Sequence, residues 1–235
     1  MHQQELSNAT IARHLHRLRS FWRYLEAYDY VEEDPLSQVS TPRQDQKLPK
    51  YLGANELDEL LRASQESWSV FCAVRNHATI AMLIYTGMRR GELIAVRTGE
   101  VALKEGSVTF RGNGSKMRVV PLVEEAVEAV TDWLEFRPDD CDHDYLFTTT
   151  HGNRIYPSRM QRIWKSVLGA NVDSESVTMQ TIRHSFATLL LQSGECSLVE
   201  IQRILGHSRP NSTAIYLHVN EGELRGAVSA HPLAT

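Results

Sequence analysis

The hydrophobic positions near the start of the chain repeat with the period of an α-helix. In residues 10–30, apolar side chains recur every three or four positions, which places them on one face of a helix. Arginines and histidines cover much of the remaining surface. Such a surface is typical either of a solvent-exposed face or of a face that contacts phosphate groups. The apolar face consists of Ile11, Leu15, Leu18, Trp22 and Leu25.

The helical pattern stops before a polar segment at residues 37–50, SQVSTPRQDQKLPK. This segment contains two prolines and no hydrophobic periodicity, the combination expected of a linker. We therefore predict an N-terminal segment at 1–36, a linker at 37–50 and a second domain at 51–235.

Beyond the linker, the pattern predicts a mostly α fold with a small antiparallel β-sheet (α+β). The stretch GANELDELLRAS begins a helix for which Asn55 is the predicted N-cap. The stretch WSVFCAVRNHATIAMLIYTG predicts a largely buried helix that Gly87 ends. Residues 106–122 contain two β-branched stretches around RGNGSK, which predicts a hairpin. Four helical segments follow from residue 123 onward, and a last short helix is predicted at 220–235.

Composition narrows the class of protein. Hydrophobic residues make up 42% of the chain and charged residues 23%, as in ordinary globular domains. The longest apolar run, at 79–85, is too short to cross a membrane. The three cysteines form no C-x-x-C pair, and the N-terminus lacks the features of a signal peptide. We therefore expect a cytoplasmic protein with no membrane partner.

The net charge of −4 gives the chain no global basic field. A nucleic-acid partner would therefore have to bind at a local basic patch. The acidic stretch RPDDCDHDY at 137–145 contains residue types that bind metals, but their spacing is irregular. We predict no metal site there.

Four short stretches carry candidate chemistry: TGMRRGEL (86–93), RGNGSKMRVVP (111–121), QTIRHSFAT (180–188) and LGHSRPNSTAIY (205–216). Taken singly, each has an ordinary structural explanation. An arginine after a helix-ending glycine commonly caps carbonyl groups. Arg183 and His184 are neighbours in an apolar helix, where one of the two can face solvent. A histidine after a glycine is a common helix end, and a tyrosine between isoleucine and leucine is most often packed in a core.

Taken together and in this order, the four stretches resemble the tyrosine recombinase (phage integrase) family, particularly its Xer-like branch. The resemblance extends from about residue 10 to residue 232. It implies a catalytic domain preceded by a remnant of the helical core-binding domain. It also implies a site-specific DNA recombinase or integrase that cleaves and rejoins DNA strands. The tyrosine attacks the scissile phosphate, leaving a 3′-phosphotyrosyl link and a free 5′-hydroxyl, with no metal and no cofactor.

The resemblance assigns roles to four residues. Arg89 and Arg183 would bind the scissile phosphate, His207 would donate a hydrogen bond to it, and Tyr216 would be the nucleophile. These residue types suit the chemistry, because a guanidinium binds phosphate through paired N–H groups and keeps its charge. Phosphoryl transfer requires mainly positioning and neutralisation of charge on the phosphate oxygens.

Two positions depart from the family pattern. Gln180 stands where relatives often have a histidine, and glutamine cannot act as a base. Asn113 stands where relatives have the lysine that protonates the leaving 5′-oxygen, and an amide cannot act as a general acid. Lys116 is the better candidate substitute and Arg111 the poorer one, since arginine is a weak proton donor. Three explanations stay open: a working enzyme with a relocated acid, a catalytically weakened homologue, or a deliberately inactivated variant.

The resemblance also implies partners. The chain would bind double-stranded DNA, with Arg13, Arg17, Arg111 and Lys116 as candidate contacts, and would associate with the nucleoid. Relatives act as tetramers of one or two related recombinases on two DNA sites. The stretch EGELRGAVSA (221–230) would dock on a neighbouring subunit or pack in cis.

Only the last helix of the family's N-terminal domain is recognisable, so we expect a shortened gene product or an excised fragment. The alternative function is a catalytically impaired homologue that acts as a DNA-binding or regulatory protein.

Overall fold

The computed structural model describes residues 6–43, 50–111, 117–169 and 177–206. The chain divides into two compact units, Met1–Lys47 and Leu48–Thr235, and each is described by itself. The predicted boundaries at 1–36, 37–50 and 51–235 stay a prediction. No helix in the described ranges combines the length and apolar character needed to cross a membrane.

The first unit contains one long helix, α1 (Asn8–Ala27), where the apolar period predicts a helix. Ser7 caps it by accepting a hydrogen bond from the Thr10 amide. The helix begins two residues earlier and ends three residues earlier than the predicted stretch 10–30. The segment after it runs back along the helix, since Arg19 Nη1 donates to Thr41 Oγ1 (2.9 Å).

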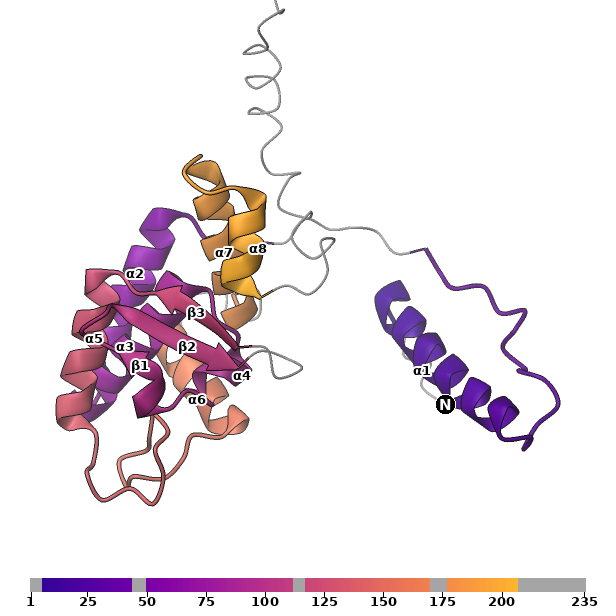
Figure 1. The fold of residues 1–235 in the computed structure, drawn as a ribbon, viewed down its shortest axis with the longest axis horizontal. Helices are drawn as coiled ribbons and strands as arrows, with labels where there is room; N and C mark the ends of the chain where they lie inside the picture. The colour runs from indigo at the N-terminus through magenta and orange to yellow at the C-terminus, as the bar shows by residue number, and fades with distance from the viewer. Residues whose placement is uncertain (1–5, 44–49, 112–116, 170–176, 207–235) are drawn as a thin grey trace, which may run out of the picture. The chain divides into compact units, whose positions relative to one another are not determined.

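The second unit is mostly helical (Figure 1). Its helices are α2 (Ala54–Gln65), α3 (Val70–Thr86), α4 (Arg90–Leu93), a 3₁₀ turn (Thr98–Glu100), α5 (Glu124–Phe136), α6 (Pro157–Leu168), α7 (Met179–Gln192) and α8 (Leu198–Leu205). The prediction of Asn55 as N-cap of α2 is wrong, because the cap is Gly53. The Glu56 carboxylate accepts a hydrogen bond from the Gly53 amide (2.7 Å). This bond pairs a backbone N–H that has no partner within the helix.

A three-stranded antiparallel sheet lies beside the helices, in the order β1 (Val101–Ala102), β2 (Ser107–Arg111) and β3 (Met117–Pro121). The predicted hairpin is confirmed as β2 and β3, with Val108 opposite Val120 and Phe110 opposite Arg118. Val108, Phe110 and Val120 are buried, so alternate positions of the hairpin face the core. The two-residue strand β1 was not predicted. The mostly α fold with a small antiparallel sheet is therefore confirmed.

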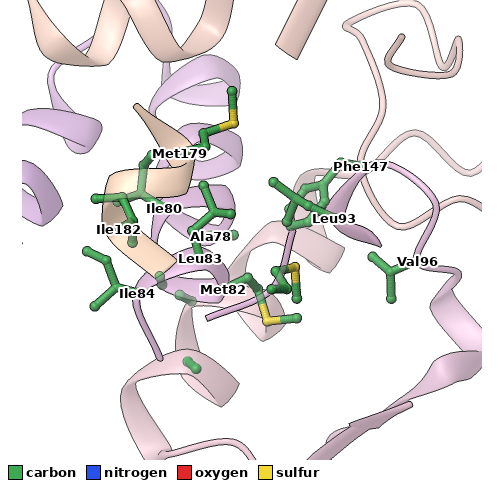
Figure 2. Packing of buried hydrophobic residues seen from close by; sticks show 14 of the residues in the cluster. Ala78, Ile80, Met82, Leu83, Ile84, Leu93, Val96, Phe147, Met179 and Ile182 are labelled. Atoms are coloured by element: carbon green, nitrogen blue, oxygen red, sulfur yellow. The ribbon is translucent and has the colours of Figure 1, made fainter. Parts of the chain in front are cut away.

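Helix α3 is the centre of the core and packs against α2, α5 and α7. Its residues 78–84 are all buried, in accordance with the apolar run in the sequence. Figure 2 shows several of them with Met179 and Ile182 of α7. At one edge of this core, Ser185 of α7 accepts a hydrogen bond from the Leu52 amide (2.7 Å), just after the linker.

One buried charge in α3 is bonded by a neutral amide and lies over an aromatic ring, with Arg75 Cζ 5.6 Å from the centroid of Phe71. Arg75 is only 3% exposed and bonds the Asn76 carbonyl oxygen through Nε (3.3 Å) and Nη2 (3.0 Å). Its Nη1 is buried and has no hydrogen-bond partner within the described residues. Burial lowers the pKa of the Arg75 guanidinium. A neutral amide therefore stands where a carboxylate would neutralise a buried cation.

Asn76→Asp should stabilise the protein. An aspartate would keep both hydrogen bonds and add a negative charge beside the buried guanidinium, a gain of about 1–2 kcal/mol. Urea unfolding at pH 7 measures the change. Asn153→Asp is the matched control, because Asn153 is exposed. Equal or lower stability of Asn76→Asp would contradict this account of Arg75.

Candidate active site

The end of α3 creates the turn on which the site is built. Gly87 adopts a left-handed conformation (φ 59°) and ends the helix, as the sequence predicts. A Cβ at this position would lie 2.5 Å from Phe186 Cδ1, so the close approach of α7 also requires glycine. The chain then leaves the helix and places Arg89 two residues later, at the start of α4.

Arg89 is held by the first turn of α4. Its amide donates to Glu92 Oε2 (2.7 Å), and its Nη1 donates to Glu92 Oε1 (3.2 Å). The Arg89 side chain is nevertheless 37% exposed, so the charge remains accessible to a ligand.

Arg183 lies on α7 and is almost completely buried, with 1% of its surface exposed. Of the two neighbours Arg183 and His184, Arg183 is therefore the one that does not face solvent. Its Nη1 donates to the Gly87 carbonyl (2.7 Å), and its Nη2 donates to the Leu205 carbonyl (2.6 Å). The guanidinium thus connects the ends of α3 and α8, and brings Arg183 to the same turn that presents Arg89.

Glu92 and Arg118 are members of this cluster that sequence reasoning did not assign. Arg118 Nη1 and Nη2 donate to the two carboxylate oxygens of Glu92 (2.8 and 2.9 Å). Arg118 Nε donates to the Ile204 carbonyl at 2.8 Å. Glu92 belongs to the motif TGMRRGEL, which also contains Arg89, and Arg118 belongs to the hairpin motif RGNGSKMRVVP. The signal that could have found the pair is an arginine opposite the apolar Phe110 in the predicted hairpin, because such a charge needs an acidic partner.

The carboxylate of Glu92 stays ionised in this setting. Burial would raise its pKa, but hydrogen bonds from Arg118 and the Arg89 backbone, with the charges of both guanidinium groups, hold the pKa below its usual range. The Glu92 carboxylate therefore accepts hydrogen bonds from both Arg89 and Arg118. The third arginine, Arg183, donates to backbone carbonyl groups instead. The cluster of three guanidinium groups and one carboxylate is positively charged, which suits an anionic ligand.

Gln180 lies one helical turn before His184 on α7, and its Nε2 is 3.4 Å from His184 Nε2. Burial, reinforced by the charge of Arg183, lowers the pKa of His184. The imidazole is therefore neutral at pH 7. Gln180 itself is exposed, and it stands one turn from Arg183 on the same side of α7.

The remaining predicted residues fall into two groups. His207, Tyr216, Asn113 and Lys116 lie outside the described residues, so their roles stay predictions. Arg13 and Arg17 are exposed on α1 in the first unit. Arg111 is exposed at the end of β2, with its Nε 3.8 Å from Glu100 Oε1.

The acidic stretch 137–145 forms a loop held by a hydrogen-bonded arginine. Arg137 donates to the carbonyl groups of Pro138, His143 and Tyr145. Across the described part of the chain, no three His, Cys, Asp or Glu side chains are grouped as metal ligands.

Comparison with known proteins gives consistent matches. The model of the phage integrase family matches residues 50–223. The chain is 35% identical to tyrosine recombinase XerD of Oceanobacillus iheyensis, over 98% of this chain and 78% of that protein. It is 34% identical to tyrosine recombinase XerC of Chlorobaculum parvum, over 95% and 73% of the two chains.

Solved structures show the same fold. The XerH site-specific recombinase in a pre-cleavage complex with its difH substrate is similar, with a TM-score of 0.79 and 26% identity over 98% of this chain and 67% of that one. The XerA recombinase is similar, with a TM-score of 0.66 and 30% identity over 92% and 74% of the two chains.

Glu92→Gln should destabilise the protein by about 2–4 kcal/mol at neutral pH, because it removes the charge that two buried or half-buried arginines share. The folded pKa of Glu92 lies below its unfolded value of 4.5. Its contribution is therefore complete above that value and is lost as the pH falls through the folded pKa. The difference between wild type and variant in urea unfolding should narrow as the pH is lowered below about 4.5.

The matched control is Glu56→Gln, which alters an exposed capping glutamate that accepts from the Gly53 amide. Its loss of stability at pH 7 should be smaller. A Glu92→Gln difference that does not change with pH would contradict an ionised, arginine-bound carboxylate.

Proposed function

Since the chain belongs to the phage integrase family and is a Xer-like tyrosine recombinase, we propose that it cleaves and rejoins DNA strands at specific sites. The observation that carries the proposal is the convergence of Arg89 and Arg183 at the end of α3, where Arg183 bonds the Gly87 carbonyl. Arg89 on the turn after α3, and Arg183 bonded to that turn from α7, place two positive charges where a scissile phosphate needs neutralisation.

In the proposed reaction, the Tyr216 phenol oxygen attacks phosphorus and the phenol proton is released. The bond from phosphorus to the 5′-oxygen breaks, a 3′-phosphotyrosyl link forms, and the 5′-oxygen takes up a proton. Arg89 and Arg183 neutralise charge on the non-bridging oxygens, and His207 donates a hydrogen bond to one of them. No metal or cofactor takes part.

The proton donor for the 5′-oxygen decides how active this chain is. Asn113 has no proton to give near neutral pH, and general-acid catalysis supplies about 10²–10⁴-fold in rate. We propose that Lys116, three residues further along the same turn, takes this role, with Arg111 as the weaker substitute. Gln180 orients a phosphate oxygen or the phenol by hydrogen bonding.

Double-stranded DNA is the proposed substrate, and the XerH structure was obtained with its difH substrate bound. The exposed guanidinium groups of Arg13, Arg17 and Arg111 support phosphate contacts from both units. The proposed function places the chain in the cytoplasm, in association with the nucleoid.

Assembly into a tetramer on two DNA sites is the further part of the proposal. The second unit has an apolar groove of about 570 Å³ between α2, the end of α3, β3, α7 and α8. Leu224 and Val228, four residues apart in the stretch 221–230, are apolar side chains that suit such a groove on a neighbouring copy. The groove is lined by Leu57, Ile84, Val120, Phe186, Leu190 and Ile204, among others.

Covalent capture tests the cleavage reaction. Duplex sites are recovered by binding selection from a random pool, and a nicked suicide version of the site is incubated with the full chain. A covalent protein–DNA adduct should form with wild type and be absent with Tyr216→Phe, which lacks the attacking oxygen. Sequence-specific binding with no adduct at any pH would instead establish the alternative, an impaired homologue that acts as a DNA-binding or regulatory protein.

Two variants on the same substrate locate the proton donor. Asn113→Lys should raise the cleavage rate about 10²-fold or more by restoring a general acid. Lys116→Ala should abolish the remaining wild-type cleavage if Lys116 is the substitute. Unchanged rates in both variants would contradict the roles proposed for this turn.

A further inference from the structure

The guanidinium of Arg118 connects two segments that the proposed reaction uses together. It donates two hydrogen bonds to Glu92, and Glu92 in turn accepts from the amide and the guanidinium of Arg89. Its third nitrogen, Nε, donates to the Ile204 carbonyl near the end of α8. All three donor atoms of a half-buried side chain are therefore directed at the borders of the candidate active site.

We propose that Arg118 is a positioning residue for strand cleavage, an inference that rests on the proposed function. Through Glu92, Arg118 fixes both the backbone and the side chain of Arg89. Through Ile204 it fixes the end of α8, and His207 follows Gly206 there in the sequence. Arg118 acts through these residues and has no role of its own at the phosphate.

The geometry requires an arginine at this position. A guanidinium offers three nitrogens in one plane, which here bond a carboxylate on one side and a carbonyl on another. The plane also lies over the Phe110 ring, with Cζ 4.9 Å from the centroid. Lysine offers one compact ammonium group, so it can keep part of the interaction with Glu92 but not the full set.

Gly206 makes this arrangement possible. It ends α8 in a left-handed conformation (φ 64°), and a Cβ there would lie 3.0 Å from Arg118 Nη1. The guanidinium therefore lies directly against the backbone that leads into His207. Arg118 is the second residue of β3. In the sequence it follows Lys116, the proposed proton donor, by two residues.

The test compares Arg118→Met and Arg118→Lys with a matched control, Arg137→Met. Arg137 is also a half-buried arginine that bonds carbonyl groups, but it holds the 138–145 loop. Each full-length variant is assayed for unfolding in urea, for DNA affinity and for single-turnover cleavage of the nicked suicide duplex. All assays run at a temperature at which every variant is folded. The parent protein is wild type if it cleaves DNA, and otherwise the Asn113→Lys variant.

We expect Arg118→Met to slow single-turnover cleavage about 10²-fold, the effect of misplacing a phosphate-binding group by roughly 1 Å. DNA affinity should change by less than about threefold, because the rate falls through lost transition-state stabilisation rather than lost binding. Arg118→Lys should recover part of the rate, and Arg137→Met should cleave like its parent. Equal rates for Arg118→Met and Arg137→Met at equal stability would overturn the proposal.

Hydrogen exchange separates this inference from the function on which it rests. The Arg89 amide donates to Glu92, so its exchange should quicken in Arg118→Met and stay unchanged in Arg137→Met. If neither parent cleaves DNA, the proposed function fails, and this exchange rate alone decides whether Arg118 positions Arg89. An Arg89 amide equally protected in both variants would overturn the positioning role.

Discussion

The second unit depends on a buried positive charge bonded to two helix ends. Arg183 donates to the carbonyl of Gly87, the residue that caps the end of α3, and to the carbonyl of Leu205, the last residue of α8. These groups lie 96 and 22 residues away in the chain. The carbonyl ends of helices carry partial negative charge, so a buried guanidinium is stabilised there without a carboxylate at those two bonds. If this side chain were shortened, two buried carbonyl groups would lose their donors, and the turn at Gly87 would lose contact with α8.

The two arginines of the candidate site differ in exposure and in the groups that they bond. Arg183 is buried and sets the positions of backbone segments, whereas Arg89 is partly exposed and is itself held by Glu92. The carboxylate of Glu92 neutralises only part of the charge of the arginines around it. The result is a positively charged turn held by hydrogen bonds, and a preorganised field of this kind is what stabilises a phosphoryl-transfer transition state.

Much of the fold could be predicted from local patterns, and the failures have physical reasons. Periodicity located the helices and the hairpin, and Gly87 marked the end of α3. Both kinds of signal are local, because each depends on residues that are close together in the chain. Asn55 was wrong as a cap because the Glu56 side chain satisfies the helix start at Gly53. Strand β1 has two residues and shows no alternation to detect.

The candidate site was predictable only in part. Motifs identified Arg89 and Arg183, but not that Arg183 is buried, because its carbonyl partners lie far away in the sequence. Arg118 and Glu92 are 26 residues apart in the chain. Neither local sequence indicates that the two side chains form an ion pair. Contacts of this range depend on tertiary packing, which hydrophobic periodicity does not encode.

The hydrogen bond from the Leu52 amide to Ser185 Oγ has a mechanical meaning. Ser185 stands two residues after Arg183 on α7 and also donates to the Thr181 carbonyl. The chain that arrives from the linker is therefore fastened to the helix that carries the buried arginine. Leu52 precedes α2 in the chain, so this attachment to α7 comes before the first helix of the second unit begins. Tension on the chain that leads to Leu52 would therefore act directly on α7, the helix that carries Arg183.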